Sequence, residues 1–153
     1  MPHLVSLRAV VDEMETLGEG THAFLNRPTG ELYGGTDDLI ESAESEDDED
    51  LLGWELETVQ RLREILDSPQ WLELPQLSSH EDHRIMERFC RERCEGDLQE
   101  ELLSAIQGRG AFRRFKDLVH RRGVHESWYA FRRDCLTEEA KAWLEANKIA
   151  FEE

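Results

Sequence analysis

The apolar residues of this chain occur in short stripes at helical spacing, and charged residues interrupt every stripe. An example near the start is the stripe of Leu4, Leu7, Val11 and Met14. Such spacing is typical of amphipathic helices with one buried face. No stretch approaches the roughly 20 apolar residues that a membrane-spanning helix needs. The pattern therefore predicts a soluble protein built mainly from helices.

Two short segments, residues 21–27 and 31–34, favour strands instead. Pro28 and Gly30 between them suit a tight turn, which predicts a small antiparallel hairpin whose apolar face, Phe24 and Leu32, lies on helices. Residues 71–75 are a possible third strand. We predict a mainly helical α+β fold with about five or six helices and this N-terminal hairpin. At 153 residues the chain suits a single domain, 1–153.

Polar residues with capping side chains mark where several helices begin. The N-caps that we expect are Ser6, Thr36 or Asp37, Ser78 and Asp97, the last two in capping boxes with Glu81 and Glu100. Two further helices are expected from Ala111 to Arg122, ended by Gly123, and from about Glu126 to Ala146.

Charge is distributed unevenly along the chain. The formal net charge is -17, yet residues 109–133 carry 8 basic and 2 acidic side chains and form a basic island. Residues 44–50 are acidic apart from Ser45. Such a run repels itself and offers nothing apolar to bury, so we predict a flexible acidic linker there. It lacks the spaced oxygen ligands and the central glycine of a calcium-binding loop.

The cysteines and the N-terminus indicate a cellular compartment. Cys90, Cys94 and Cys135 are an odd number without a disulfide framework, which favours a reducing environment. Asp12 and Glu13 fall where a signal peptide would have its apolar core. We therefore predict a cytoplasmic protein.

One helix face gathers residue types that bind metals. These residues are His80, His83, Glu87, Cys90 and Cys94. Fourteen residues at about 1.5 Å each separate His80 from Cys94 by roughly 21 Å, so one metal ion cannot bind them all. Cys90 and Cys94 could chelate only with ligands from elsewhere, and we expect Cys90 in the core. We predict no metal site.

Recognisable catalytic and nucleotide-binding motifs are missing from the sequence. It has no Walker loop, no complete Gly-x-Gly-x-x-Gly, no Gly-x-Ser-x-Gly and no Cys-x-x-Cys. We therefore predict no cofactor and assign no catalytic residue, although an enzyme built from scattered residues stays open.

The basic island predicts an amphipathic helix with a cationic outer face. Its apolar face would contain Ala111, Phe112, Phe115, Leu118 and Val119. The candidate anion-binding or partner-binding residues are Gly108, Arg109, Gly110, Arg113, Arg114, Lys116, Arg121 and Arg122. The two glycines could form only a tight turn between helices, or their backbone N–H groups could receive an anion at the start of the helix. The sequence is compatible with both interpretations, a tight turn and an anion-binding site.

These features favour a non-enzymatic protein-binding or regulatory module that uses the basic helix face. Its partner would be an acidic protein or a second copy of the chain. The first alternative is a nucleic-acid-binding protein that uses Arg109 to Arg133, including Trp128, Tyr129 and Phe131. The second alternative is an enzyme of unknown reaction.

Two sequence blocks carry a resemblance to a known family. They are Gly-Arg-Gly-Ala-Phe-Arg-Arg-Phe-Lys at 108–116 and Trp-Tyr-Ala-Phe-Arg at 128–132, with weaker support at 24–31 and 143–145. The chain resembles a small bacterial family catalogued only as uncharacterised. The resemblance implies no activity and no catalytic residue, and it supports the single-domain reading. It also places a glycine where Lys148 stands, so the helix end near Asn147 is expected to differ in detail.

Overall fold

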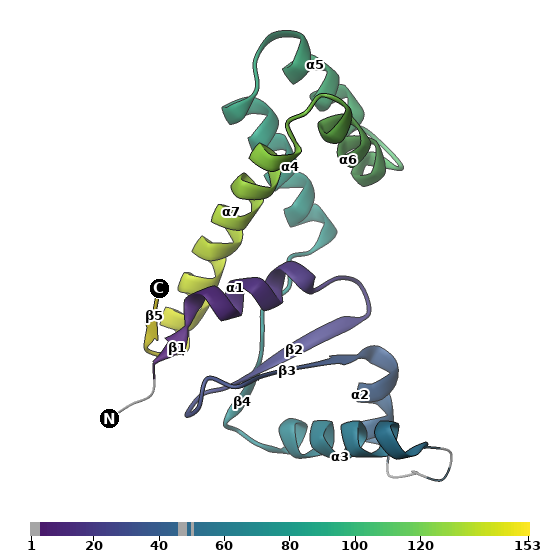
Figure 1. The fold of residues 1–153 in the computed structure, drawn as a ribbon, viewed down its shortest axis with the longest axis vertical. Coiled ribbons are helices and arrows are strands. Elements are labelled where there is room, and N and C mark those ends of the chain that lie inside the picture. Colours follow the sequence, from purple (N-terminus) through teal and green to yellow (C-terminus); the bar gives the residue numbers. More distant parts are fainter. Residues whose placement is uncertain (1–3, 46–48, 50) are drawn as a thin grey trace. The chain divides into compact units, whose positions relative to one another are not determined.

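The computed structural model describes residues 4–45, 49 and 51–153 (Figure 1). In chain order its elements are β1 (Val5–Ser6), α1 (Leu7–Thr16), β2 (Thr21–Asn26), β3 (Leu32–Thr36), α2 (Asp37–Glu44), α3 (Gly53–Asp67), β4 (Trp71–Glu73), α4 (Ser79–Arg93), α5 (Gly96–Ala105), α6 (Ala111–Arg121), α7 (His125–Ala146) and β5 (Phe151–Glu152). The prediction of a mainly helical α+β fold is confirmed. The seven helices in the described residues exceed the predicted five or six.

The chain divides into two compact units. Unit 1 contains residues 1–76 and 139–153, and unit 2 contains residues 77–138. Helix α7 contributes residues to both units. A single domain over 1–153 stays a prediction.

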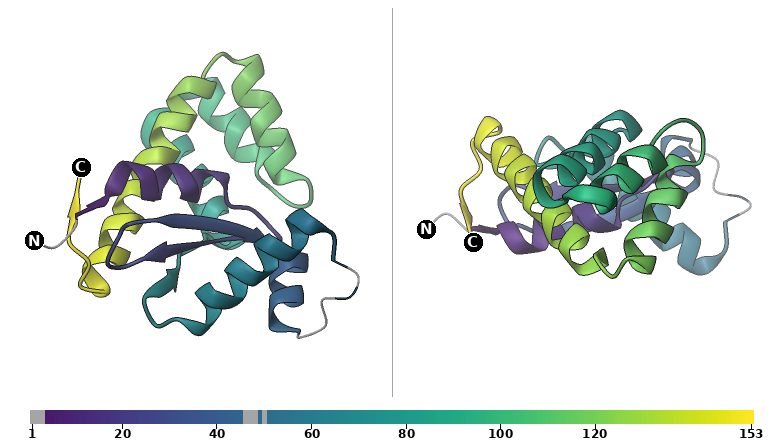
Figure 2. Two further views of the ribbon diagram at one scale, coloured as in Figure 1. Left: turned by 60° about the horizontal axis from the view of Figure 1, so that its bottom comes forward. Right: turned by 90° about the horizontal axis from the view of Figure 1, so that it is seen from above.

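Unit 1 is built on a three-stranded sheet with the order β3-β2-β4. β2 pairs antiparallel with both neighbours, with Phe24 opposite Tyr33 on one side and opposite Glu73 on the other. Helix α1 covers one face of the sheet, and α2 and α3 cover the other (Figure 2). Because both faces are covered, the consecutive residues Ala23, Phe24 and Leu25 are all buried. The pairing of β4 with β2 shows that the expected third strand, at residues 71–75, is present as β4.

The core between the sheet and α3 forms around Phe24 of β2. It packs in one cluster with Val59, Leu62 and Ile65 of α3 and Ala43 of α2. This agrees with the expectation that Phe24 lies on helices. Leu32 is only half-buried.

The first strand of the chain was not anticipated. β1 pairs in parallel with β5, with Val5 opposite Phe151. Leu4, which was expected on the first helix, lies outside α1 and is 43% exposed. The helix starts at Leu7 because the Ser6 hydroxyl oxygen accepts a hydrogen bond from the Ala9 N–H at 3.1 Å, so the expected cap is confirmed.

Unit 2 consists of helices around an aromatic core. Phe89 of α4 lies 5.5 Å from Trp128 and 5.6 Å from Phe131 of α7, measured between ring centroids. Phe115 of α6 lies 4.7 Å from Trp128 in an edge-to-face arrangement. Such ring pairs add to the stabilisation from apolar burial, so these rings fix α4, α6 and the first half of α7 together.

Only part of the predicted capping is present in unit 2. The Ser78 hydroxyl accepts from the Glu81 N–H at 3.1 Å and donates to the Glu81 carboxylate at 3.2 Å, so the predicted N-cap is confirmed. The box predicted at Asp97 is wrong. Helix α5 begins one residue earlier, at Gly96, and Gly96 has a φ of 61° that only glycine adopts readily.

Helices α6 and α7 end in the same backbone motif. After α6, Gly123 N–H donates to His120 and Val124 N–H to Val119, and Gly123 has a φ of 71°. After α7, Lys148 N–H donates to Glu145 and Ile149 N–H to Leu144. This is the Schellman motif, which usually has glycine at the left-handed position. Lys148 has a φ of 57° there, the one positive φ of a non-glycine residue in the described part of the chain.

The predicted acidic linker falls mostly outside the described residues. Of residues 44–50, the structure describes 44, 45 and 49. Glu44 is the last residue of α2 and Ser45 its C-cap. A search of the described residues finds no helix that is both long enough and apolar enough to cross a membrane.

A candidate partner-binding face on helix α6

Helix α6 presents two neighbouring rows of side chains on its outer surface. Phe112, Lys116 and His120 follow one another at intervals of four residues and form one row. The second row contains Arg113, Asp117 and Arg121, and the exposed Arg109 lies in the turn before the helix. Both rows are exposed, while Ala111, Phe115 and Val119 point into the core. Tyr129 of α7 joins the first row, because its hydroxyl lies 3.2 Å from His120 Nε2.

We call this surface the basic–aromatic face. It consists of Arg109, Phe112, Arg113, Lys116, Asp117, His120, Arg121 and Tyr129. Two of its aromatic rings are exposed, since Phe112 is 40% and Tyr129 48% accessible. The prediction that Phe112 lies in the core is therefore wrong. At 100° per residue it sits at the border of the buried stripe, next to the cationic side.

Four cations of the face have no fixed partner. Within the described residues, the side chains of Arg109, Arg113, Lys116 and Arg121 make no hydrogen bond and no ion pair. Lys116 lies close enough to Asp82 to act on its carboxyl group. Burial raises the pKa of the Asp82 carboxyl group, while Arg132 at 3.5 Å and Lys116 act on it in the opposite direction. The positive charge on this face thus remains available to a partner.

Arg114, a predicted binding residue, is used inside unit 2 instead. Its guanidinium donates to the carbonyls of Ala105, at 3.0 Å, and of Gln107 and Arg109. These carbonyls lie at the end of α5 and in the turn before α6, where helix geometry leaves C=O groups without partners. The structure therefore places Arg114 in a capping role.

Arg122 also has a partner within unit 2. Its guanidinium lies 2.7 Å from the Glu101 carboxylate of α5. Of the six predicted basic residues, four remain on the open face and two bind neighbouring groups of the fold.

The two predicted glycines form the turn between α5 and α6. Gly108 and Gly110 have φ values of 71° and 75°, in the left-handed region that glycine adopts without strain. A Cβ on Gly110 would also lie 3.1 Å from Arg114 Nη1. These observations support the turn role. An anion at the start of α6 stays a prediction.

The two units differ in their formal net charge. Residues 77–138 contain 12 acidic and 12 basic side chains, so unit 2 is formally neutral. The entire net charge of -17 therefore belongs to the residues of unit 1. The basic–aromatic face thus lies on a neutral unit within an acidic protein.

A ring stack adjoins the end of this face. The rings of His120 and His125 lie 4.6 Å apart and nearly parallel. His125 Nδ1 is buried and is the one such side-chain nitrogen or oxygen without a hydrogen-bond partner among the described residues. The stack fixes the junction of α6 and α7 beside Tyr129.

His83 and Cys90 of α4, and Cys94 just after it, serve the fold. His83 Nε2 lies 2.7 Å from the Ile106 carbonyl, and Cys90 and Cys94 are buried in the core of unit 2. Burial raises the pKa of the Cys90 thiol to about 12 and also raises that of Cys94 and Cys135. Such thiols are poor nucleophiles. Across the described part of the chain, no group of three or more potential ligands is placed to hold a metal ion.

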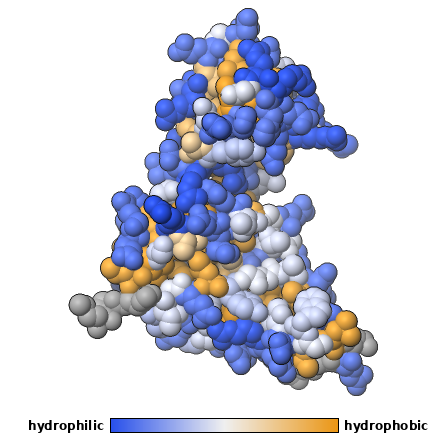
Figure 3. All heavy atoms as spheres, viewed as in Figure 1, coloured by the Kyte–Doolittle hydropathy of each residue, from blue (hydrophilic) through white to orange (hydrophobic). Residues whose placement is uncertain are grey.

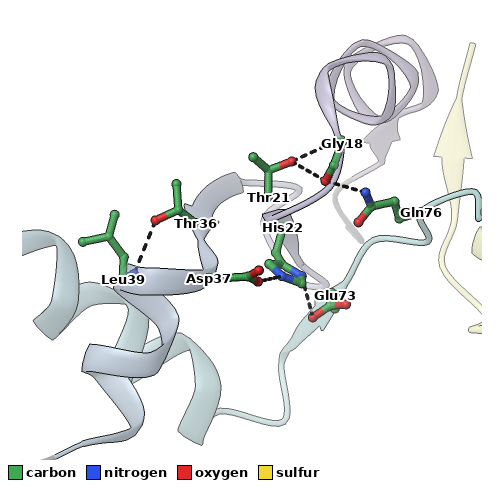
Figure 4. Close-up of polar contacts among 8 residues, drawn as sticks. All are labelled: Gly18, Thr21, His22, Thr36, Asp37, Leu39, Glu73 and Gln76. Carbon is green, nitrogen blue, oxygen red and sulfur yellow. Dashed lines mark hydrogen bonds and ion pairs between the residues drawn. The ribbon is translucent and has the colours of Figure 1, made fainter. Parts of the chain in front are cut away.

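Unit 1 contains a polar cluster that the sequence did not reveal. His22 of β2 lies between two carboxylates, with Nε2 2.6 Å from Asp37 and Nδ1 3.6 Å from Glu73 (Figure 4). Asp37 begins α2 and Glu73 ends β4, so the cluster joins three elements. The pairing of β2 with β3 brings Asp37 to His22, and the pairing of β2 with β4 brings Glu73 there. No local motif indicates the cluster. Both carboxylates are exposed. On the surface of unit 1 the cluster links β2 to the start of α2 and to the end of β4.

A small open pocket of about 290 Å³ lies between α2 and α3. It is lined by Ala43, Glu44, Arg63, Leu66 and Asp67. The Arg63 guanidinium donates to the carbonyls of Ala43 at 3.1 Å and Ser45 at 2.8 Å, so it caps the end of α2. The charged lining residue Arg63 therefore stabilises the end of α2.

Comparison with known proteins places the chain among relatives without an assigned activity. It matches the uncharacterised protein family UPF0158 over residues 2–153. No curated protein and no solved structure matches it. Since the match covers nearly the whole chain, the protein belongs to the uncharacterised protein family UPF0158.

Proposed function

We propose that this protein is a cytoplasmic, non-enzymatic binding module whose unit 2 holds an acidic partner on the basic–aromatic face. The observation that carries the proposal is a set of four exposed cations that have no partner among the residues the structure describes, beside two exposed aromatic rings. The three buried free cysteines suit a reducing compartment.

The chemistry of the face favours binding over catalysis. Arginine and tyrosine are enriched among the residues that contribute most to protein interfaces. The cations would attract and orient an acidic chain, because charge complementarity accelerates encounter and excludes partners of the wrong sign. The rings of Phe112 and Tyr129 would supply apolar contact area. Both parts of the face are therefore needed for selective binding.

The direct test is a titration with fluorescein-labelled poly-glutamate, followed by fluorescence anisotropy. The parent protein should bind, and its affinity should fall as salt is raised, since exposed charges are screened. The double variant Arg113→Glu/Lys116→Glu should lose at least about tenfold in affinity, because both cations become repulsive. Equal affinity in the parent and the double variant would refute the proposed face.

A matched control separates the face from the total charge. Arg8→Glu/Lys148→Glu changes the net charge by the same amount at two exposed positions of unit 1. It should bind poly-glutamate nearly as well as the parent protein. An equal loss in both double variants would show that only the total charge matters.

Nucleic-acid binding is the second candidate, and the exposed rings favour it. Phe112 and Tyr129 beside cations resemble a surface on which unpaired bases could stack. The neutrality of unit 2 removes part of the repulsion that the total charge implies. A labelled single-stranded oligonucleotide should then bind at low salt and be released steeply as salt rises. If the protein binds poly-glutamate but not the oligonucleotide, the result favours an acidic protein partner over nucleic acid.

A further inference from the structure

The start of α3 exposes apolar side chains that the fold of unit 1 does not use. Leu52 and Trp54 are each 65% exposed, the largest values among the large apolar residues of the described chain. Apolar atoms are visible over this end of α3 at the lower right of Figure 3. The neighbouring Leu51 packs against the core cluster of unit 1, whereas Leu52 and Trp54 lie outside it.

These residues contribute to α3 through their backbones. The Leu52 carbonyl accepts from the Leu56 N–H at 2.8 Å, and the Trp54 carbonyl accepts from the Thr58 hydroxyl at 3.0 Å. Their exposed side chains lie outside the core cluster of unit 1. A tryptophan that is buried at an interface covers about 150–250 Å² and is among the strongest contributors to binding. An exposed pair of this kind indicates a contact surface.

Acidic residues flank the exposed pair in the sequence. Glu55 and Glu57 follow within the first turns of α3. The five sequence positions before Leu51, residues 46–50, are all acidic. We call residues 51–57 the acidic tryptophan segment. Its chemistry is complementary to the basic–aromatic face. The segment has exposed apolar side chains beside carboxylates, whereas the face has exposed rings beside four cations and one carboxylate, Asp117.

We propose that the acidic tryptophan segment of one copy of this protein docks on the basic–aromatic face of a second copy. This inference rests on the proposed function and names the partner. Glu55 and Glu57 would face the cations of the two α6 rows, while Trp54 would pack on Phe112 or Tyr129. The row from Phe112 to His120 is about 12 Å long, enough for one to two turns of a docked helix.

The two surfaces differ, so the contact is of the head-to-tail kind. Such a contact links each copy to the next and forms open chains unless a ring closes. A helix turn against a helix face buries a small area, which is typical of weak and reversible association. The expected behaviour is self-association that increases with protein concentration and decreases with salt.

Mixing two complementary variants tests this contact by sedimentation velocity. The variant Arg113→Glu/Lys116→Glu disrupts the basic–aromatic face and leaves the acidic tryptophan segment intact. The variant Leu52→Ser/Trp54→Ser disrupts the acidic tryptophan segment and leaves the basic–aromatic face intact. We expect the parent protein to form oligomers at low salt, each variant alone to be monomeric, and the equimolar mixture to form heterodimers and nothing larger. The replaced side chains are exposed, and circular dichroism would verify that both variants are folded.

The other outcomes overturn the inference. A monomeric parent protein at every concentration, a self-associating single variant, or a mixture that stays monomeric each contradicts the head-to-tail contact. If the parent protein is monomeric and still binds poly-glutamate on the face, the inference fails and the proposed function survives. If neither form of binding occurs, both fail.

Discussion

Adjacent arginines on α6 have opposite roles. Arg113 is exposed and makes no ion pair or hydrogen bond within the described residues, whereas Arg114 donates to three carbonyls of the preceding helix end and turn. Both residues look alike in the sequence, because a cationic helix face does not show which side chains fold back. The distinction comes from the position of the α5 end, which depends on tertiary structure.

Replacing these arginines one at a time should separate stability from binding. Arg114→Ala should lower the free energy of unfolding by about 1–2 kcal/mol, since it removes charge-assisted hydrogen bonds at a helix C-terminus. Arg113→Ala should change it by less than about 0.5 kcal/mol but weaken poly-glutamate binding. Urea denaturation and anisotropy measure the two effects. Equal stability losses in the two variants would contradict the assignment.

Lys148 holds a backbone conformation that disfavours side chains. Its φ of 57° lies in the left-handed region, at the position where the Schellman motif usually has glycine. Lys148→Gly should therefore raise the free energy of unfolding by roughly 1 kcal/mol. Lys148→Ala removes the same charge but keeps the Cβ, and it should give no comparable gain. A stabilisation by alanine as large as that by glycine would assign the effect to the charge.

At the scale of elements, local patterns predicted some helix starts and missed others. Ser6, Thr36 and Ser78 each accept a hydrogen bond at the cap, as their residue types indicate. The start of α5 was missed because Gly96 begins that helix with a positive φ, and no capping side chain marks it. The pairing of β1 with β5 joins the two ends of the chain, and short-range spacing carries no information about such contacts.

The turn between α5 and α6 should be sensitive to any side chain at Gly110. Gly110→Ala forces a residue with a Cβ to a φ of 75° and brings that Cβ to 3.1 Å from Arg114 Nη1. We expect a loss of about 1–2 kcal/mol in thermal or chemical unfolding. Gly53→Ala is the matched control, since Gly53 begins α3 and has open space around its Cβ position. It should be neutral or slightly stabilising. A neutral Gly110→Ala would contradict the strain argument.

At the scale of the whole molecule, the prediction of a single domain means that the chain should unfold cooperatively, in one transition. The chain forms two compact units, and α7 contributes residues to both. We expect one calorimetric unfolding transition with equal calorimetric and van't Hoff enthalpies, because a helix shared by both units couples their unfolding. Two resolved transitions would show that the units are separate domains.

The sequence predicted the charge asymmetry of the molecule but not how the fold distributes it. The basic island was visible as residues 109–133. That unit 2 is neutral and unit 1 carries the whole excess of negative charge depends on which helices fold together. The exposure of Phe112 and Tyr129, which adds apolar rings to the cationic side of α6, likewise depends on how α6 packs in unit 2.

Hydroxyl-radical footprinting of the parent protein, with and without poly-glutamate, tests the central claim most directly. The oxidation of Phe112 and Tyr129 should fall when the ligand binds, because both rings lie on the basic–aromatic face. The oxidation of Trp54, which is 65% exposed, should not fall, and it serves as the internal reference at a protein concentration at which the protein is monomeric. Unchanged oxidation of Phe112 and Tyr129 at saturating poly-glutamate would contradict the assignment of this face.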